Sequence, residues 1–551
     1  MTRLMLPFAL LLLTCNITLT IQGNAQNVLH EYDTGAIYED RATRQLQSIG
    51  TVDQHHYYLH IPGHQLQGSH RRARNKKVFV SIHDEALQMV TKQEISLAPQ
   101  RKRVLVQGAY FLAGKLTVIS SAVDKPGQIC RLYATELHTG TLEPIGETRL
   151  VAEYSMGEGV NMGFKVAVSP DTRKVMVFAT QYGRHNEPLQ HTVDVFNDVM
   201  VRQWTSGWLP GRLHHTGYLR RETFRICDQG DVYLMGRAYD NIHGFRNKAG
   251  VHRSKPVNEW LLVDYPNYRY MIYRFTSDDP QGRFAVLQLP EYFIRSLNFR
   301  IGENNEVLCY GLYSRQGMVS PEGVFTFRFN LHTARIRDLA IFEALEPGEY
   351  LVGNEVTRLQ NALGNLREWD PFDYTISELH ARSNGDLYFI AEQTLRSRRH
   401  ATVHFNKDLT SFLFKHDLLI VNLQATGEGD QQEDSITIQR VVKTQQIPAW
   451  FPFGSYGMME LGDDLLFFYN EIPATSRISR RSRVGEMILA HVPYDGVVSY
   501  TKVGEELFGH SKPVLPETIR VIDTGVFTFG THSLIGKSHR FGKLSVKISS
   551  K

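Results

Sequence analysis

A short motif recurs along this chain: a tight polar turn followed directly by a run of β-branched or aromatic residues. It is clearest at residues 171–178, where Asp-Thr-Arg-Lys precedes Val-Met-Val-Phe, and at 384–390, where Asn-Gly-Asp precedes Leu-Tyr-Phe-Ile. Gly, Asn and Asp accept the positive φ that a tight two-strand reversal needs. Each copy therefore predicts a β-hairpin. Similar copies begin near residues 113, 228, 303, 462 and 523.

The copies are spaced by 57 to 81 residues, and a second hairpin follows each of them. The best second hairpin runs from 324 to 339, with its turn at 330–333. Each repeat therefore supplies four strands, an inner pair and an outer pair. Counting second hairpins gives eight repeats. The inner pair of the first repeat, near Tyr57 to Ile61, is poorly marked, which leaves seven repeats as the alternative.

Repeated four-stranded units of this length are typical of β-propeller blades, because a blade buries both of its faces only by stacking in a ring. The chain resembles the broad β-propeller class, and the secreted bacterial proteins within it, over nearly all of its length. The resemblance implies an all-β fold with a single propeller over residues 26–551. It implies no functional residue, because the class hosts binding proteins and enzymes alike. Two smaller propellers or two β-sandwiches are less natural, since no linker-like stretch divides the chain.

The two ends of the chain carry further predictions. The last repeat ends at residues 543–548 without a fourth strand, and a strand near Val28 to Tyr32 could complete it and close the ring. Before that strand, Arg3 and an apolar run over 4–13 lead to Gly-Asn-Ala at 23–25, which is typical of a signal peptide. We predict cleavage after Ala25 and export to the periplasm or the exterior.

Two features of the sequence bear on anchoring and redox chemistry. Cys15 loosely fits a lipoprotein box, but Thr14 stands where such boxes carry Gly, Ala or Ser, so we do not expect a lipid anchor. No later stretch has the ~20 apolar residues of a membrane-spanning helix. The mature chain keeps only Cys130, Cys227 and Cys309. Three cysteines exclude a disulfide framework, and we expect them to be buried as small apolar residues.

Charge divides the connections between strands into two kinds. Because strand direction alternates within a blade, the turns inside hairpins fall on one face of the disc, and all other connections fall on the opposite face. The hairpin turns are mostly acidic or neutral, whereas five connections between inner and outer pairs are rich in Arg and Lys, although the whole chain carries a formal charge of only +4. Arg suits bidentate binding of carboxylate, sulfate or phosphate. The candidate ligand-binding residues are Arg71, Arg72, Arg74, Arg253, Lys255, Arg398, Arg399, Arg480, Arg481 and Arg483.

Aromatic residues lie in blade-to-blade connections on the same predicted face. Trp208 and Trp450 are the candidates, and rings beside Arg suit a sugar or a nucleobase. Each ring has an alternative role as a wedge between blades. The acidic turns likewise have an alternative explanation, since Asp is favoured in turns for backbone reasons alone.

These observations predict an exported binding or scaffold protein that engages an anionic polysaccharide or an envelope protein through a basic face. Nucleic acid is not an expected partner. No motif for a cofactor or a metal is present, and the sequence does not predict an oligomeric state. The alternative is a carbohydrate-active hydrolase or lyase with its site in the propeller funnel, where paired carboxylates could act as acid and base. The densest acidic group comprises Glu368, Asp370, Asp373, Glu378 and His380.

Overall fold

Every regular element in the described part of the chain is a β-strand. The computed structural model describes residues 28–39, 43–62, 78–97, 104–158, 160–182, 188–210, 218–239, 268–302, 306–315, 321–343, 373–398, 411–426, 433–443, 445–448, 454–471, 486–503, 514–523, 525–532 and 538–548. No helix long and apolar enough to cross a membrane occurs in these ranges. The predicted signal peptide, with Cys15, lies outside them.

The strands form eight antiparallel sheets of four main strands each, which we number as blades 1 to 8. Blades 1 to 4 are β2 (Thr43–Val52), β3 (His55–Pro62), β4 (Val78–His83), β5 (Met89–Ile95); β6 (Val104–Leu112), β7 (Lys115–Asp124), β8 (Ile129–Leu137), β9 (Arg149–Ser155); β10 (Asn161–Val168), β11 (Lys174–Tyr182), β12 (Pro188–Asn197), β13 (Arg202–Thr205), with β14 (Leu209–Pro210); and β15 (Tyr218–Ile226), β16 (Val232–Tyr239), β17 (Tyr268–Phe275), β18 (Arg283–Leu287). Blades 5 to 8 are β19 (Tyr292–Ile301), β20 (Glu306–Arg315), β21 (Gly323–Asn330), β22 (Arg335–Phe342); β23 (Asp373–Ile376), β25 (Leu387–Arg398), β26 (Ser411–Thr426), β27 (Glu433–Val441), with β24 (His380–Ala381) and β28 (Gln445–Pro448); β29 (Tyr456–Leu461), β30 (Asp464–Glu471), β31 (Glu486–Val492), β32 (Ser499–Val503); and β33 (Val514–Asp523), β34 (Val526–His532), β35 (Ser538–Ile548), β1 (Val28–Glu39).

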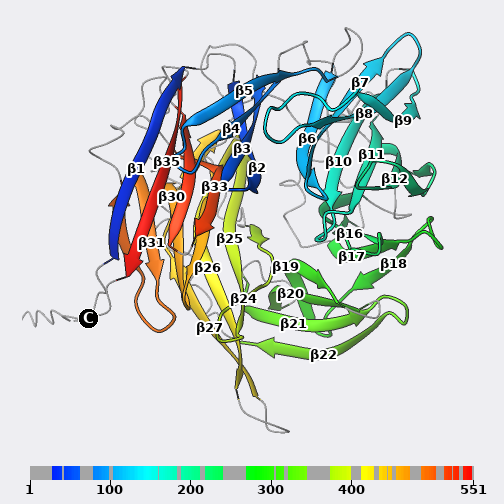
Figure 1. Ribbon diagram of the computed structural model, residues 1–551. Coiled ribbons are helices and arrows are strands. Elements are labelled where there is room, and N and C mark those ends of the chain that lie inside the picture. Colours follow the sequence, from blue (N-terminus) through cyan, green and yellow to red (C-terminus); the bar gives the residue numbers. More distant parts are fainter. Residues whose placement is uncertain are drawn as a thin grey trace, which may run out of the picture.

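The ring is closed by the two ends of the chain. Strand β1 pairs antiparallel with β35, from Val28 opposite Ile548 to Glu39 opposite Ser538. Figure 1 shows β1, in blue, beside β35, in red, with the blades following one another round the ring in chain order. The prediction of a propeller with eight blades, closed by an N-terminal strand, is confirmed. The poorly marked inner pair of the first blade is β2 and β3.

Apolar packing explains why the blades close into a ring. The second strand of a blade is covered on both faces; in β30, for example, all residues from Leu465 to Asn470 are buried. The buried apolar residues form eight clusters, and each cluster joins two neighbouring blades. We call the interface between adjacent blades a seam, and each seam holds one cluster. The faces of a blade are therefore covered by its two neighbours in the ring.

The hairpin turns have the conformation that the sequence predicts. Gly230 and Gly385 lie in turns between the first two strands of blades 4 and 6, with φ of 94° and 92°. Only glycine adopts this region without a steric cost. These turns, and those between the third and fourth strands, define what we call the turn face.

The opposite face, which we call the loop face, receives the connections from second to third strand and from blade to blade. The five basic connections each run from a second strand to a third strand. The strands that flank them are β3 and β4, β16 and β17, β25 and β26, β30 and β31, and β34 and β35. All five pairs of strand ends therefore lie at the loop face.

Candidate functional site

Most of the predicted binding residues belong to connections that the structure does not describe. Arg71, Arg72, Arg74, Arg253, Lys255, Arg399, Arg480, Arg481, Arg483 and Trp450 lie outside the described residues. Arg398 was expected in a loop, but the structure places it as the last residue of β25. Lys543, just after the last basic connection, lies inside β35. Its charge helps to lower the pKa of His56 in blade 1.

Trp208 is described, and it lies between β13 and β14. Strand β14 pairs with Gln190 and His191, near the start of β12, so Trp208 is in the half of blade 3 nearer the loop face. The ring is 37% exposed, and it packs edge-on against Tyr154 of blade 2 with 6.1 Å between ring centroids. The ring is thus partly wedged between blades, as the alternative role predicts, and its part in ligand binding stays a prediction. Trp204 lies in β13, just before this connection.

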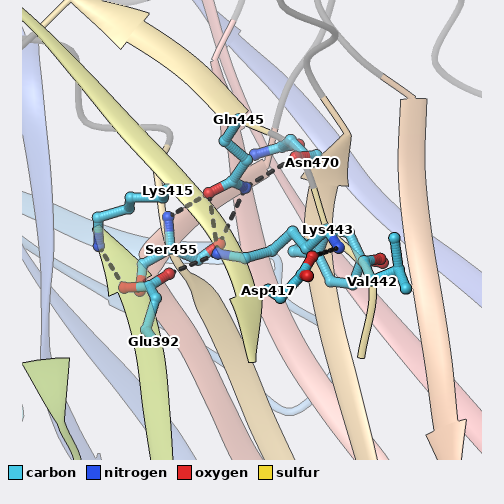
Figure 2. Close-up of polar contacts among 9 residues, drawn as sticks. Glu392, Lys415, Asp417, Val442, Lys443, Gln445, Ser455 and Asn470 are labelled. Carbon is cyan, nitrogen blue, oxygen red and sulfur yellow. Dashed lines mark hydrogen bonds and ion pairs between the residues drawn. The ribbon is translucent and has the colours of Figure 1, made fainter. Parts of the chain in front are cut away.

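A buried ionic network lies beneath the loop face of blades 6 and 7, and we call it the Glu392 network (Figure 2). The Glu392 carboxylate accepts from two ammonium groups, with Lys415 Nζ at 2.7 Å and Lys443 Nζ on its other oxygen. The hydroxyl of Ser455 donates to the same carboxylate at 3.2 Å. The Lys443 side chain is fully buried and that of Glu392 is 4% exposed. Such a pair stabilises a fold only when hydrogen bonds satisfy its remaining atoms, as they do here.

A β-bulge directs Lys415 to this carboxylate. In the pairing of β25 with β26, the register shifts between Glu392 and Thr394, because residues 416 and 417 together lie opposite Gln393. A bulge of this kind reverses which face the following side chains take. Lys415 thus faces blade 7, as Glu392 does, while Asp417 accepts hydrogen bonds from the Arg440 Nε at 2.6 Å and the Lys443 N–H at 3.0 Å.

The side chain of Gln445 clamps the segment that contains Trp450. Its Oε1 accepts from the Ser455 N–H at 2.8 Å, and its Nε2 donates to the Ser455 carbonyl at 3.1 Å. Gln445 Oε1 also accepts from Lys443 Nζ at 3.2 Å, which ties the clamp to the Glu392 network. The two ends of the 445–455 segment are thereby held together at the loop face.

Burial and charge set the protonation states in the network. Burial alone would raise the pKa of Glu392, but the charges of Lys443 and Lys415 outweigh it and hold that pKa below its usual value. Burial lowers the pKa of Lys443, and the attraction of Glu392 offsets this only in part. Because both groups are sealed from solvent, they are suited to holding strand ends in place and not to reacting with a substrate.

The acidic turn face is explained by local bonding. Asp228 Oδ1 accepts the backbone N–H of Asp171 in the neighbouring blade at 3.0 Å, and Asp171 in turn accepts the N–H of Arg173 at 3.0 Å. Asp464 accepts the N–H of Tyr494 at 2.9 Å. Turn geometry therefore accounts for these carboxylates.

The acidic group proposed for acid–base chemistry is only partly described. Glu368 and Asp370 lie outside the described residues, and Asp373 begins β23. Glu378 accepts from Arg225 Nη1 of blade 4 at 2.7 Å. His380 stacks on Tyr388, with 5.1 Å between ring centroids, and burial lowers its pKa. Two of the described members are thus engaged elsewhere, Glu378 with Arg225 and His380 with Tyr388.

A cavity of about 660 Å³ opens on the turn face between blades 3, 4 and 5. Cys227 lines it together with Asp228, Arg300 and Glu306. Cys227 is partly buried, whereas Cys130 and Cys309 are fully buried, and all three are free thiols. Burial raises the pKa of Cys130 to about 12. The expectation of buried small apolar residues is confirmed for Cys130 and Cys309 and holds in part for Cys227.

Comparison with known proteins narrows the class no further than the fold. No protein-family profile matches the chain, and no curated protein matches it. Among solved structures, it is similar to an acylaminoacyl peptidase of Pyrococcus horikoshii, with 10% identity and a TM-score of 0.32 over 89% of this chain and 58% of that one. An apocarotenoid oxygenase of Synechocystis gives 9% identity and a TM-score of 0.32 over 87% and 96%. An α-L-arabinanase of Penicillium chrysogenum is 9% identical, with a TM-score of 0.28 over 70% of this chain and 92% of that one. The chain spans little more than half of the peptidase, and none of these similarities assigns it an activity.

Proposed function

We propose that this chain is an exported binding protein that captures an anionic polysaccharide on its loop face. The observation that carries the proposal is the placement of five Arg- and Lys-rich connections between strands whose ends all lie at that face. Positive charge gathered on one face raises the local concentration of an anionic ligand and the rate at which it is captured.

The sector over blades 6 and 7 is the strongest part of the proposed site. Three connections with candidate residues leave and re-enter the described strands of this sector: 399–410 with Arg399, 449–453 with Trp450, and 472–485 with Arg480. The Glu392 network and the Gln445 clamp fix the strand ends from which these segments depart. Fixed ends favour binding, because less conformational freedom is lost when the ligand is bound.

The first experiment is a glycan and polyanion array probed with the mature chain at low and at moderate salt. We expect capture of acidic polysaccharides that weakens as salt rises, since exposed charges are screened. The variant Arg480→Glu/Arg481→Glu/Arg483→Glu should lose about tenfold in affinity, because each exposed ion pair contributes about 0.5 kcal/mol. Its matched control, Arg173→Glu/Arg283→Glu/Arg335→Glu, makes the same charge change on the turn face and should bind normally.

Two results would count against this function. Equal loss of affinity in both variants would show that binding depends on the net charge of the protein and not on the position of the charges at the loop face. Silence across the array, with a folded protein, would shift the proposal to a protein partner. Export is tested separately by sequencing the N-terminus of the secreted protein, which should begin at Gln26.

A further inference from the structure

The seam that closes the ring, between blades 8 and 1, differs from the other seven. Its apolar cluster has five buried members among the described residues, whereas each of the other clusters has ten or more. The same face of blade 1 also carries four buried polar side chains: His56, His60, Ser81 and His83. Among the described side chains, less apolar surface holds this seam than any other, so its polar contacts matter more to its stability.

Three of these side chains form a continuous hydrogen-bonded chain. His60 Nε2 lies 2.7 Å from Ser81 Oγ, and Ser81 Oγ lies 3.0 Å from His83 Nε2. The His83 ring packs against Phe541 of blade 8, with 4.3 Å between ring centroids. The Tyr58 ring also packs against Phe541, with 4.4 Å between ring centroids. The chain thus lies inside the seam and touches both blades.

The bonding pattern fixes the protonation of the chain. His83 Nδ1 lies 3.3 Å from the Leu87 carbonyl, which can only accept, so Nδ1 carries the proton. In neutral His83 the Nε2 atom is then an acceptor, and the Ser81 hydroxyl donates to it. Since Ser81 has one proton to give, His60 Nε2 must donate to Ser81. While His83 is neutral, both bonds are made and the Ser81 proton has an acceptor. A protonated Nε2 would instead donate to the Ser81 oxygen, and the Ser81 proton would lose this acceptor.

We infer that this seam is an acid-sensitive clasp, at which protonation of the His60–Ser81–His83 chain loosens blade 1 from blade 8. A proton on His83 Nε2 removes the acceptor of the Ser81 hydroxyl and buries a positive charge against the Phe541 ring. The unfavourable cost of that charge falls on the ring-closing contact, so the seam opens before the rest of the propeller unfolds.

The charged groups around the chain support this direction. Burial lowers the pKa of His83 to about 4; the neighbouring His60 and His56 lower it further, and the Leu87 carbonyl and Asp84 oppose the shift. Burial also lowers the pKa of His56, with Lys543 of blade 8 and His55 adding to the effect and Asp84 and Glu85 opposing it. A histidine whose folded pKa is lowered stabilises the native state above its unfolded value of 6.5, and that contribution is lost as pH falls from 6.5 towards 4.

The test is hydrogen exchange of the full mature chain at pH 7.5 and pH 5, corrected for intrinsic rates. His83 alone predicts that the opening equilibrium of the seam rises about thirtyfold over this range. Exchange should therefore increase in β3, β4 and β35 and stay constant in blade 5. The variant His83→Gln should remove most of the increase, with a smaller part left to His56, whereas His332→Gln, at an exposed histidine of a turn in blade 5, should keep all of it.

A proton NMR titration of the wild-type histidines keeps the inference testable if His83→Gln does not fold. We expect one buried ring to titrate below pH 5. A His83 that titrates near pH 6.5 would overturn the clasp, and so would acid-enhanced exchange spread evenly over all eight blades.

Discussion

The side-chain amide of Asn470 binds both backbone groups of Val514 in the next blade. Its Nδ2 donates to the Val514 carbonyl at 2.8 Å, and its Oδ1 accepts from the Val514 N–H at 2.9 Å. Asn470 lies one residue before the end of β30, and Val514 begins β33, so the bonds join blades 7 and 8 at the loop face. The carbonyl of Asn470 also accepts from Gln445 Nε2 at 2.7 Å. One residue thereby links three consecutive blades.

Asn470→Ala should cost about 3 kcal/mol of unfolding free energy, because it leaves two buried backbone groups of Val514 without partners. Urea denaturation of both proteins measures the difference. Gln203→Ala is the control; this exposed side chain donates to the carbonyl of Val201, two residues before it, at 3.3 Å, so the change should stay within about 0.5 kcal/mol. If Asn470→Ala lost as little unfolding free energy as Gln203→Ala, water would be replacing the amide of Asn470 as the partner of Val514.

Glu392→Gln should destabilise the chain by about 3–5 kcal/mol, since two ammonium groups then lose their counter-charge in a buried site. The double variant Glu392→Leu/Lys443→Met leaves only Lys415, which is 17% exposed, without a counter-charge, so it should cost less than Glu392→Gln alone. The double variant is the control for lost volume and shape. If it were the less stable of the two, packing and not charge would dominate.

The same substitution should change the response to acid. The pKa of Glu392 is held below its unfolded value of 4.5, so its stabilisation is present above pH 4.5 and is lost as pH falls through the lowered value. In Glu392→Gln, the curve of unfolding free energy against pH should be flatter below pH 4.5 than in the wild type. Parallel curves would contradict the assignment of an ionised Glu392.

The fold could be predicted from the sequence because its signals are local. Turn residues and the strands they join lie within ten residues, as at 384–390, and the faces of the disc follow from counting strands. The Glu392 network could not be predicted in this way. Glu392 and Lys443 are 51 residues apart, and only the bulge opposite Gln393 brings Lys415 to the same carboxylate.

The extent of β25 was also missed, for a related reason. The sequence places Arg398 in a loop, but β28 pairs with Phe412 to Lys415 and extends the sheet of blade 6 beyond four strands. The extra strand supports the start of β26, and β25 continues alongside it to Arg398. A strand that depends on a partner so far along the chain leaves no local signal.

Asp194→Asn should raise the unfolding free energy at pH 7, by no more than about 1 kcal/mol. Burial raises the pKa of Asp194, with partial opposition from Arg202, so ionising this carboxyl above that pKa costs stability. The amide still accepts from the Tyr154 hydroxyl, which donates to Asp194 at 2.9 Å. Asp194→Ala removes that acceptor and should cost about 2 kcal/mol. Thermal unfolding of both variants measures the two changes. Equal losses of stability in Asp194→Asn and Asp194→Ala would show that the Tyr154 hydrogen bond does not contribute.

Gly311→Ala should destabilise blade 5 by about 3 kcal/mol, because its new Cβ would collide with the carbonyl oxygen of Ser296. The close approach follows from the bulge at Arg295, which lies between the paired positions Ile294 and Ser296 of β19. The control is Gly114→Ala, where φ is 83° and no atom lies within 4 Å. Backbone strain alone should cost about 1 kcal/mol there. Equal losses of unfolding free energy would show that β19 shifts to make room.

Gln445→Ala should weaken polyanion binding roughly threefold to tenfold while the chain stays folded. The clamp on Ser455 is lost, so the segment that contains Trp450 must be ordered when the ligand binds, which costs about 1 kcal/mol. Gln181→Ala is the matched control, because Gln181 is also buried and its Nε2 donates to a backbone carbonyl of the neighbouring blade, that of Ser155, at 2.7 Å. Gln445→Ala should lose more stability, because the Gln445 side chain makes four hydrogen bonds among the described residues and that of Gln181 makes one, but only Gln445→Ala should lose affinity in a calorimetric titration of the folded proteins. Equal affinities would place the binding site away from blades 6 and 7, and the basic connections of the other blades would then be tested in turn.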